Sequence, residues 1–272
     1  MKLLKQFFNF YIDSSVHVSL AVCCLQAIIM IKYCSIINNS LLYFTFFSSL
    51  LAYNLIKYSK YIIDNYHNIS YKLKIIAVIS IFSLFLSLFF AFSLSLYEII
   101  LVLFAGMITL LYAIPIFLVT NNNLRAVKGL KIYLVALVWT IITVLFPLEY
   151  YRDFGLLFIL ITFIQIFIYV LIAIIPFEIR DIDIDDKRLS TIPQKIGVKN
   201  TKVLGILMIL FLVLFELLKI ELNTINNLSL DVFIVSFIMI FLIINSKKGQ
   251  SKFYSSFWVE GVPILWVLLL LF

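Results

Sequence analysis

Residues 177 to 188 read FEIRDIDIDDKR, which places five carboxylates within nine positions. On a helix, Glu178, Asp181 and Asp185 stand at i, i+3 and i+7, so the three side chains would share one face. Carboxylates gathered in this way repel one another unless a cation neutralises them. Hard oxygen ligands without His or Cys suit Mg²⁺, which commonly bridges carboxylates and substrate phosphates. The spacing therefore favours a magnesium site.

A second interpretation of the same residues is a solvated polar loop, in which Lys187 and Arg188 balance the acids. Runs of charge are usually wet surface. Residue types alone leave both interpretations open.

The composition of the chain indicates a membrane protein. Of its 272 residues, 64% are hydrophobic, and the mean hydropathy is +1.14. Soluble domains contain about 45–50% apolar residues, so a soluble globular protein is excluded. We expect an all-α polytopic membrane protein in one integral-membrane domain, residues 1–272.

A spanning helix needs about 20 largely apolar residues. The sequence predicts nine such spans, with edges uncertain by several residues. They cover residues 16 to 37, 40 to 56, 74 to 93, 96 to 119, 130 to 148, 155 to 176, 202 to 222, 230 to 245 and 256 to 272. Lys32, near the end of the first span, is expected to snorkel toward the headgroups.

The basic residues predict an orientation. If the N-terminus is cytoplasmic, every Lys and Arg except Lys32, Arg152 and Lys219 falls on the inner side, as the positive-inside rule requires. We expect a bacterial inner or plasma membrane, with the N-terminus in the cytoplasm and the C-terminus outside. The net charge of +7 then orients the protein in the bilayer, and gives no reason to invoke nucleic acid.

The longer stretch EIRDIDIDDKRLSTIPQKIG resembles the second aspartate-rich motif of the UbiA-type membrane prenyltransferases. That motif is approximately DxxDxxxDR, a short spacer, TLP and then Gly. The run R-D-I-D-x-D looks most like the branch that prenylates dihydroxynaphthoate on the way to menaquinone. The matching positions are Glu178, Asp181, Asp185, Thr191, Pro193 and Gly197.

A second patch, LLYAIPIFLVTNNNLRAVKGLKIYLVALVW, lies between the fourth and fifth spans. It resembles the family's tyrosine-x-x-proline segment, followed by basic residues and a Gly-Leu-Lys-like start of the next helix. The residues that carry this likeness are Tyr112, Pro115, Arg125, Lys128, Gly129 and Lys131.

The resemblance implies about nine transmembrane helices around a central cavity. It further implies an Mg²⁺ cofactor held by Asp181 and Asp185, the expected catalytic residues, with Glu178 as third ligand. The expected diphosphate contacts are Arg180, Lys187, Arg188, Arg125, Lys128 and Lys131, the last three having membrane orientation as their alternative role. Tyr112 is expected to line the cavity or to anchor at the membrane interface.

The chain departs from the family at the first motif, NDxxDxxxD, which should fall in YNLIKYSKYIIDNY. Asn54 matches the leading asparagine, but Leu55, Tyr58 and Ile62 occupy the acid positions. We hypothesise that Lys57 or Lys60 touches phosphate oxygens directly, since ammonium groups bind phosphate as point charges. The alternative is that these lysines only orient the protein. Asn54 is a further candidate for contact with the diphosphate, and Tyr58 is a further candidate for lining the cavity.

The expected function is transfer of an isoprenyl chain from a prenyl diphosphate to a lipophilic, aromatic acceptor, as in quinone biosynthesis. The missing motif favours an alternative, a catalytically inactive UbiA-like binding or scaffold protein. A small transporter that uses the carboxylates as an ion site is the third hypothesis, although transport sites generally lie near the middle of the membrane.

Overall fold

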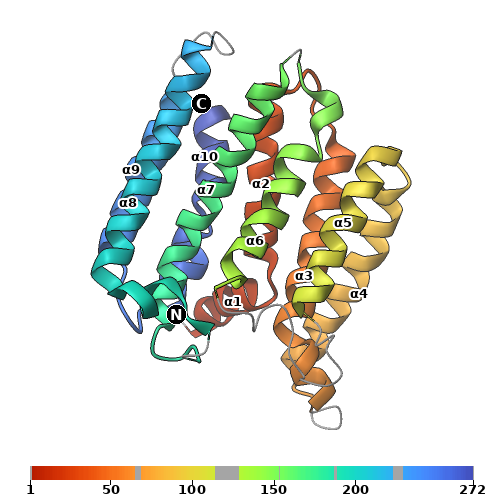
Figure 1. Ribbon diagram of the computed structural model, residues 1–272. Helices are drawn as coiled ribbons and strands as arrows, with labels where there is room; N and C mark the ends of the chain where they lie inside the picture. The colour runs from red at the N-terminus through yellow and green to blue at the C-terminus, as the bar shows by residue number, and fades with distance from the viewer. Residues whose placement is uncertain are drawn as a thin grey trace.

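The computed structural model describes residues 2–64, 69–113, 129–152, 154–186, 189–222 and 229–271. These residues form helices and contain no β-strand (Figure 1). The helices are α1 (Lys2–Asp13), α2 (Val16–Tyr33), α3 (Asn39–Asp64), α4 (Tyr71–Ala91), α5 (Leu96–Ala113), α6 (Lys131–Thr140), α7 (Leu156–Asp181), α8 (Ile192–Glu221), α9 (Leu230–Asn245) and α10 (Val262–Leu271). Shorter π-helical or 3-10 segments are η3 (Ile141–Leu145), η4 (Leu148–Tyr150) and η6 (Tyr254–Val259).

Each predicted span coincides with a helix, which confirms the all-α polytopic class. Seven of the helical segments are long and apolar enough to cross a membrane, as in an integral membrane protein. α9 is apolar but has only 16 residues, and α3 is longer but is not among the seven. The number nine therefore stays a prediction.

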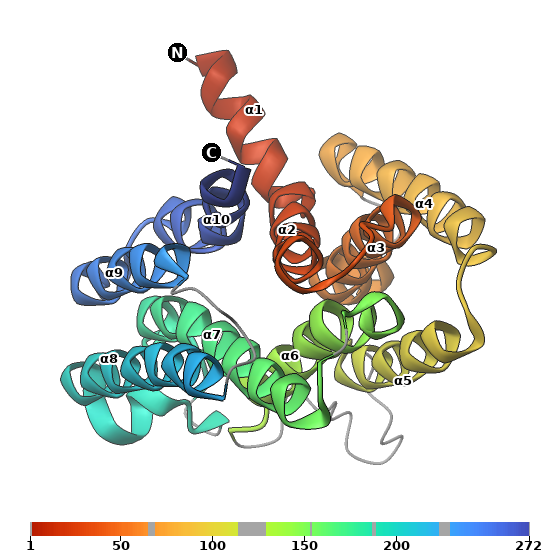
Figure 2. The same cartoon turned by 90° about the horizontal axis from the view of Figure 1, so that it is seen from above.

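The helices are arranged as a ring (Figure 2). From α2 to α4 and from α5 to α10, helices that follow one another in the chain pack side by side, and α10 returns against α2 to close the ring. α1 extends away from the ring. The centre of the ring is the place where side chains from distant parts of the sequence meet.

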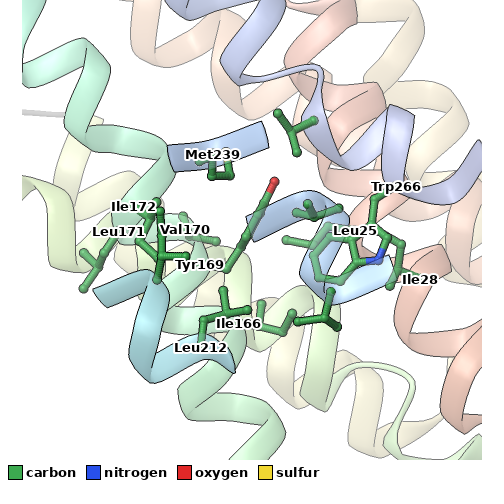
Figure 3. Packing of buried hydrophobic residues seen from close by; sticks show 14 of the residues in the cluster. Leu25, Ile28, Ile166, Tyr169, Val170, Leu171, Ile172, Leu212, Met239 and Trp266 are labelled. Carbon is green, nitrogen blue, oxygen red and sulfur yellow. The ribbon is translucent and has the colours of Figure 1, made fainter. Parts of the chain in front are cut away.

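The largest buried apolar cluster joins α2, α6, α7, α8, α9 and α10 (Figure 3). Tyr169 of α7 packs edge-on against Trp266 of α10, with ring centroids 5.4 Å apart. Close packing depends on Gly205 of α8, because a Cβ there would stand 2.9 Å from side-chain carbons of Ile175 and Ile243. Small residues at helix contacts are typical of membrane bundles.

α4 shows the opposite arrangement to a soluble helix. It buries Ser83 and Ser87 toward its neighbours and exposes Val78, Phe85 and other apolar side chains. Lipid is as apolar as these side chains, so their exposure carries no penalty in a bilayer.

A buried charge network joins three helices at one end of the bundle. Lys219 and Glu216 of α8 are both fully buried, with 3.6 Å between Nζ and Oε2. The ammonium of Lys32 lies 3.6 Å from Glu216 Oε1 and 3.0 Å from Asp231 Oδ2. Carboxylates on α8 and α9 hold the Lys32 ammonium, and its snorkelling toward the headgroups stays a prediction. We call Lys32, Glu216, Lys219 and Asp231 the Lys219 network.

Neutral side chains complete this network. Lys219 donates hydrogen bonds to Gln165 Oε1 at 2.5 Å and to the hydroxyl oxygen of Tyr33 at 3.2 Å. The indole N–H of Trp266 donates to Asp231 at 2.6 Å. The network thus links α2, α7, α8, α9 and α10 through polar contacts that are strong in a low-dielectric interior.

The connections at the opposite end meet one another. Lys252, before η6, lies 3.2 Å from Asp13 of α1, and Lys72 of α4 also pairs with Asp13. The Gly249 N–H donates to the Arg180 carbonyl at 3.2 Å, and the Gly129 N–H donates to the Leu189 carbonyl at 3.0 Å. We call this the motif end, since it holds the acidic stretch; it is at the bottom of Figure 1. Its assignment to the cytoplasm stays a prediction.

Replacing Lys219 by Met should lower the free energy of unfolding by on the order of 3 kcal/mol, because the fully buried Glu216 loses a counter-charge. Thermal unfolding of the protein in detergent measures this effect. Lys199→Met, at an exposed position of the same helix, is the control and should change little. The double variant Lys219→Met with Glu216→Gln should recover part of the loss; an unchanged melting temperature in Lys219→Met would refute the structural role of the network.

Candidate functional site

The acidic stretch begins on α7, which runs into the motif end. Glu178 is on its last turn, only 4% exposed, and Asp181 is its last residue. The backbone N–H groups of Ile184 and Asp185 both donate to the Asp181 carbonyl, at 2.9 and 2.8 Å, and form a turn. The expectation that all three acids share one helix face is therefore wrong for Asp185, which lies in the turn beyond the helix.

Lys131 brings two of the acids together nevertheless. It is the first residue of α6, and its Nζ lies 3.1 Å from Glu178 Oε1 and 3.3 Å from Asp185 Oδ2. We call Glu178 and Asp185 the acid pair. The turn after α7 thus places Asp185 against the same cation as Glu178. On a continuous helix, Asp185 would lie elsewhere.

Asp181 has a different partner. The guanidinium of the adjacent Arg180 donates to both of its carboxylate oxygens, from Nε and Nη2, at 2.7 Å each. Bidentate pairs of this kind are the strong charge-assisted hydrogen bonds. Arg180 also lies over the ring of Phe177, 5.1 Å from its centroid. Both residues stay site candidates, but here they neutralise each other.

The segment after the acids explains the TIP-x₃-G pattern. The Gln194 side chain accepts a hydrogen bond from the Thr191 N–H and donates one to the Asp185 carbonyl, each at 3.0 Å. Pro193 stands in the first turn of α8, where its missing N–H is not needed. Gly197, with φ 78 and ψ 160, bends the helix in a conformation open essentially to glycine alone. α8 therefore starts ten residues before the span predicted at 202.

The second patch meets the first through Gly129. Its φ of 69 is also in the left-handed region, and its N–H bond to the Leu189 carbonyl ties the start of α6 to the acidic loop. Lys131 follows two residues later. Gly129 and Lys131 of the second patch therefore belong to the same site as the acidic stretch.

A cavity of about 250 Å³ opens beside these residues. Glu178, Asp181 and Lys131 form part of its wall, and most of the remainder is apolar or aromatic. The other lining residues are Tyr53, Ile132, Val135, Trp139, Tyr169, Val170, Ala173, Ile174, Phe177, Val259, Glu260 and Pro263. A charged mouth on an apolar chamber suits an amphiphile with an anionic head.

Glu260 is a cavity residue that the motifs did not predict. It follows the π-helical η6, and its N–H donates to the Ser255 carbonyl at 3.1 Å, a bond of the i→i+5 type. Such π-helical turns frequently occur at functional sites. A signal was available in the sequence, because Glu260 is the lone charged residue of an otherwise apolar span.

A second cavity of about 140 Å³ lies between α3, α5 and α6. Tyr53, Val135 and Trp139 line both cavities. The Trp139 indole N–H donates to the Tyr53 hydroxyl oxygen at 2.6 Å, so a hydrogen-bonded aromatic pair stands between the two spaces. Tyr112 lines this second cavity.

The α3 candidates point to neighbouring helices. Asn54 donates to Ser80 Oγ of α4 at 3.0 Å, and Lys57 donates to the Ile12 carbonyl of α1 at 3.4 Å. The Tyr58 hydroxyl donates to the Asp13 carbonyl at 2.7 Å. Tyr58 was expected to line the cavity, but it binds the end of α1 and lines neither cavity described above. Phosphate contact by Lys57 stays a prediction.

Several other candidates lie outside the described residues or side chains, and the structure says nothing of them. These are Arg125, Lys128, Lys187 and Arg188, together with the side chain of Lys60.

The acidic residues of the site meet some of the requirements for binding a divalent cation. Within the described ranges, no three His, Cys, Asp or Glu side chains converge closely enough to hold a metal ion. The acid pair does offer two hard oxygen ligands that already share one cation, the ammonium of Lys131. Oxygen ligands of this kind suit Mg²⁺, which keeps several waters and rarely needs a full protein cage.

Comparison with known proteins identifies the fold. No family model matches the sequence, and no curated protein does. A UbiA homologue from Aeropyrum pernix K1, in its apo structure, superposes with a TM-score of 0.66 at 14% identity, covering 94% of this chain and 96% of that one. The chain has the UbiA fold.

Two further structures with the UbiA fold are similar over nearly their whole length. A UbiA homologue from Archaeoglobus fulgidus bound to GPP and Mg²⁺ gives a TM-score of 0.60 at 12% identity, covering 96% of this chain and 98% of that one. A digeranylgeranylglyceryl phosphate synthase gives 0.58 at 14% identity, covering 99% and 98%. The fold expected from the two motif patches is thereby confirmed.

Replacing Gly197 by Ala should destabilise the protein by about 1–3 kcal/mol, since a side chain disfavours the required φ and ψ. Gly106→Ala is the matched control, because Gly106 is helical with no atom within 4 Å of an added Cβ. The control should be neutral or stabilising. Melting temperatures of both variants in detergent test the bend; equal shifts in the two would contradict it.

Proposed function

We propose that the protein belongs to the UbiA superfamily and, as a single membrane domain, transfers an isoprenyl chain from an isoprenyl diphosphate to a lipophilic, aromatic acceptor of the quinone-biosynthesis type. The observation that carries the proposal is the acid pair, whose Glu178 lies in the wall of a largely apolar cavity together with Lys131 and Asp181. The A. fulgidus homologue bound to GPP and Mg²⁺ supports the substrate class.

The acid pair, with Asp181 as a further ligand, would hold Mg²⁺, which when bound offsets the negative charge of the diphosphate. The chain's own cations act on the same group, because Lys131 and Arg180 lie next to these acids. As the allylic C–O bond breaks, its electron pair leaves with the diphosphate, and donors already in place stabilise the developing charge.

The cavity wall supports the second half of the reaction. The allylic cation forms a bond to an acceptor carbon, and that carbon then gives up its proton to the released diphosphate. The aromatic faces of Tyr53 and Trp139 and the apolar residues around them exclude water, which would otherwise capture the cation. The electron-rich faces of aromatic rings also attract positive charge.

One observation favours a second candidate, a UbiA-like protein that binds a prenyl diphosphate without turnover. α3 carries no carboxylate at the positions of the first motif, and Asn54 and Tyr58 are engaged with α4 and α1. Fewer acids at the diphosphate would weaken ionisation more than binding.

The test uses purified full-length protein in detergent or nanodiscs, labelled dimethylallyl and geranyl diphosphates, and a panel of aromatic quinone precursors. Glu178→Gln and Asp185→Asn should each lower transfer by roughly 10²-fold or more, because each removes charge that meets the leaving diphosphate. Asp183→Asn, whose exposed carboxylate pairs with Lys248, is the control and should retain activity.

Chelation of divalent cations should abolish transfer, and Mg²⁺ should restore it. Transfer that persists in excess EDTA, or in Glu178→Gln, would refute the proposed role of the acid pair. Diphosphate binding without any transfer across the panel would select the second candidate.

A further inference from the structure

We propose that Lys131 is the resting counter-ion of the acid pair, and that substrate binding exchanges it: the divalent cation takes Glu178 and Asp185 while the Lys131 ammonium turns to the diphosphate. The inference rests on the proposed function. It adds that one cation replaces another at the same site when substrate binds.

The distances show that the ammonium and a metal ion compete for one place. Lys131 Nζ is 3.1 Å from Glu178 and 3.3 Å from Asp185, so both oxygens face a single point between them. Mg²⁺ binds carboxylate oxygens at about 2.0–2.1 Å. A metal ion on both oxygens would lie next to the present position of Nζ, and two cations that close repel each other.

Burial prevents the ammonium from simply leaving. Glu178 is 4% exposed and Asp185 is 17% exposed at the side chain, so the pair is poorly solvated. A buried carboxylate that loses its counter-charge is strongly destabilised. Lys131 therefore leaves the acid pair only when another cation replaces it.

The diphosphate supplies the new partner. Lys131 lines the main cavity as well as a small recess formed with Gly129, Leu189 and Thr191. A lysine has a flexible four-carbon stem and a compact charge, so rotation about that stem can turn the ammonium into the cavity while α6 stays in place. Metal and diphosphate should then favour each other's binding, and this coupling is reciprocal.

The experiment measures binding without acceptor, by titration calorimetry on full-length protein in nanodiscs. Mg²⁺ alone is titrated first, and geranyl diphosphate is titrated next in the presence of Mg²⁺. In Lys131→Met, Mg²⁺ affinity should rise about tenfold while geranyl diphosphate affinity falls about tenfold, a typical size for a coupling between two ligands.

Two further variants separate this exchange from other effects. Lys248→Met removes a charge from the same end of the bundle, where Lys248 pairs with Asp183, and should leave Mg²⁺ affinity unchanged. Lys131→Arg keeps the charge and should fold even if Lys131→Met does not. Its planar fork would hold two carboxylate oxygens more firmly, so Mg²⁺ affinity should fall below that of the wild type.

Unchanged or weaker Mg²⁺ binding in Lys131→Met overturns the exchange, and so does an equal gain in Lys248→Met. Mg²⁺ affinity in Lys131→Arg that equals or exceeds the wild type also overturns it. If the metal and diphosphate affinities shift as expected but no acceptor is ever prenylated, the exchange stands and the proposed transfer reaction fails. The two failures are therefore distinguishable.

Discussion

A charge inside a membrane bundle must meet an opposite charge, because neither lipid nor packed side chains solvate it. This constraint organises both ends of the protein. At the motif end, the ammonium of Lys131 lies between Glu178 and Asp185, and Arg180 neutralises Asp181. At the other end, Lys219 and Glu216 are fully buried and form an ion pair supported by Lys32. α7 takes part in both arrangements, through Glu178 and Asp181 at the motif end and through Gln165 at the other, so polar contacts hold this helix at both ends.

The two clusters differ in what surrounds them. The space beside the Lys219 network is only about 10 Å³, which is at the lower limit for one water, and Lys219 also binds Gln165 and Tyr33. Glu178 of the acid pair, with Lys131 and Asp181, instead borders a cavity of about 250 Å³ with a largely apolar wall. The need for a counter-charge therefore gives an enclosed structural ion pair at one end. At the other end it gives an ion pair that lies beside a cavity and can exchange its partner. A ligand with an anionic head and an apolar tail matches the second arrangement only.

The altered first motif also has a physical account. Tyr58 occupies a position where the family places an acid, and it and the neighbouring Lys57 donate to carbonyls at the end of α1. Asp13, the last residue of α1, in turn pairs with Lys72 and Lys252. α3 thus helps to hold α1 at the motif end. Glu260 is a further acidic residue in the cavity wall, beside Glu178 and Asp181.

The sequence by itself determined the helical class, the positions of the apolar runs and the two patches that resemble UbiA-type prenyltransferases, because hydropathy and short motifs are local properties. Tertiary structure decided which charges meet. Lys131 is 47 residues from Glu178 and 54 from Asp185, and Lys32 is 199 from Asp231. Helical spacing placed Asp185 on α7, but a backbone turn after Asp181 moved it off the helix and against Lys131. Pairings across the ring depend on how the helices pack, and no periodicity within one helix encodes that packing.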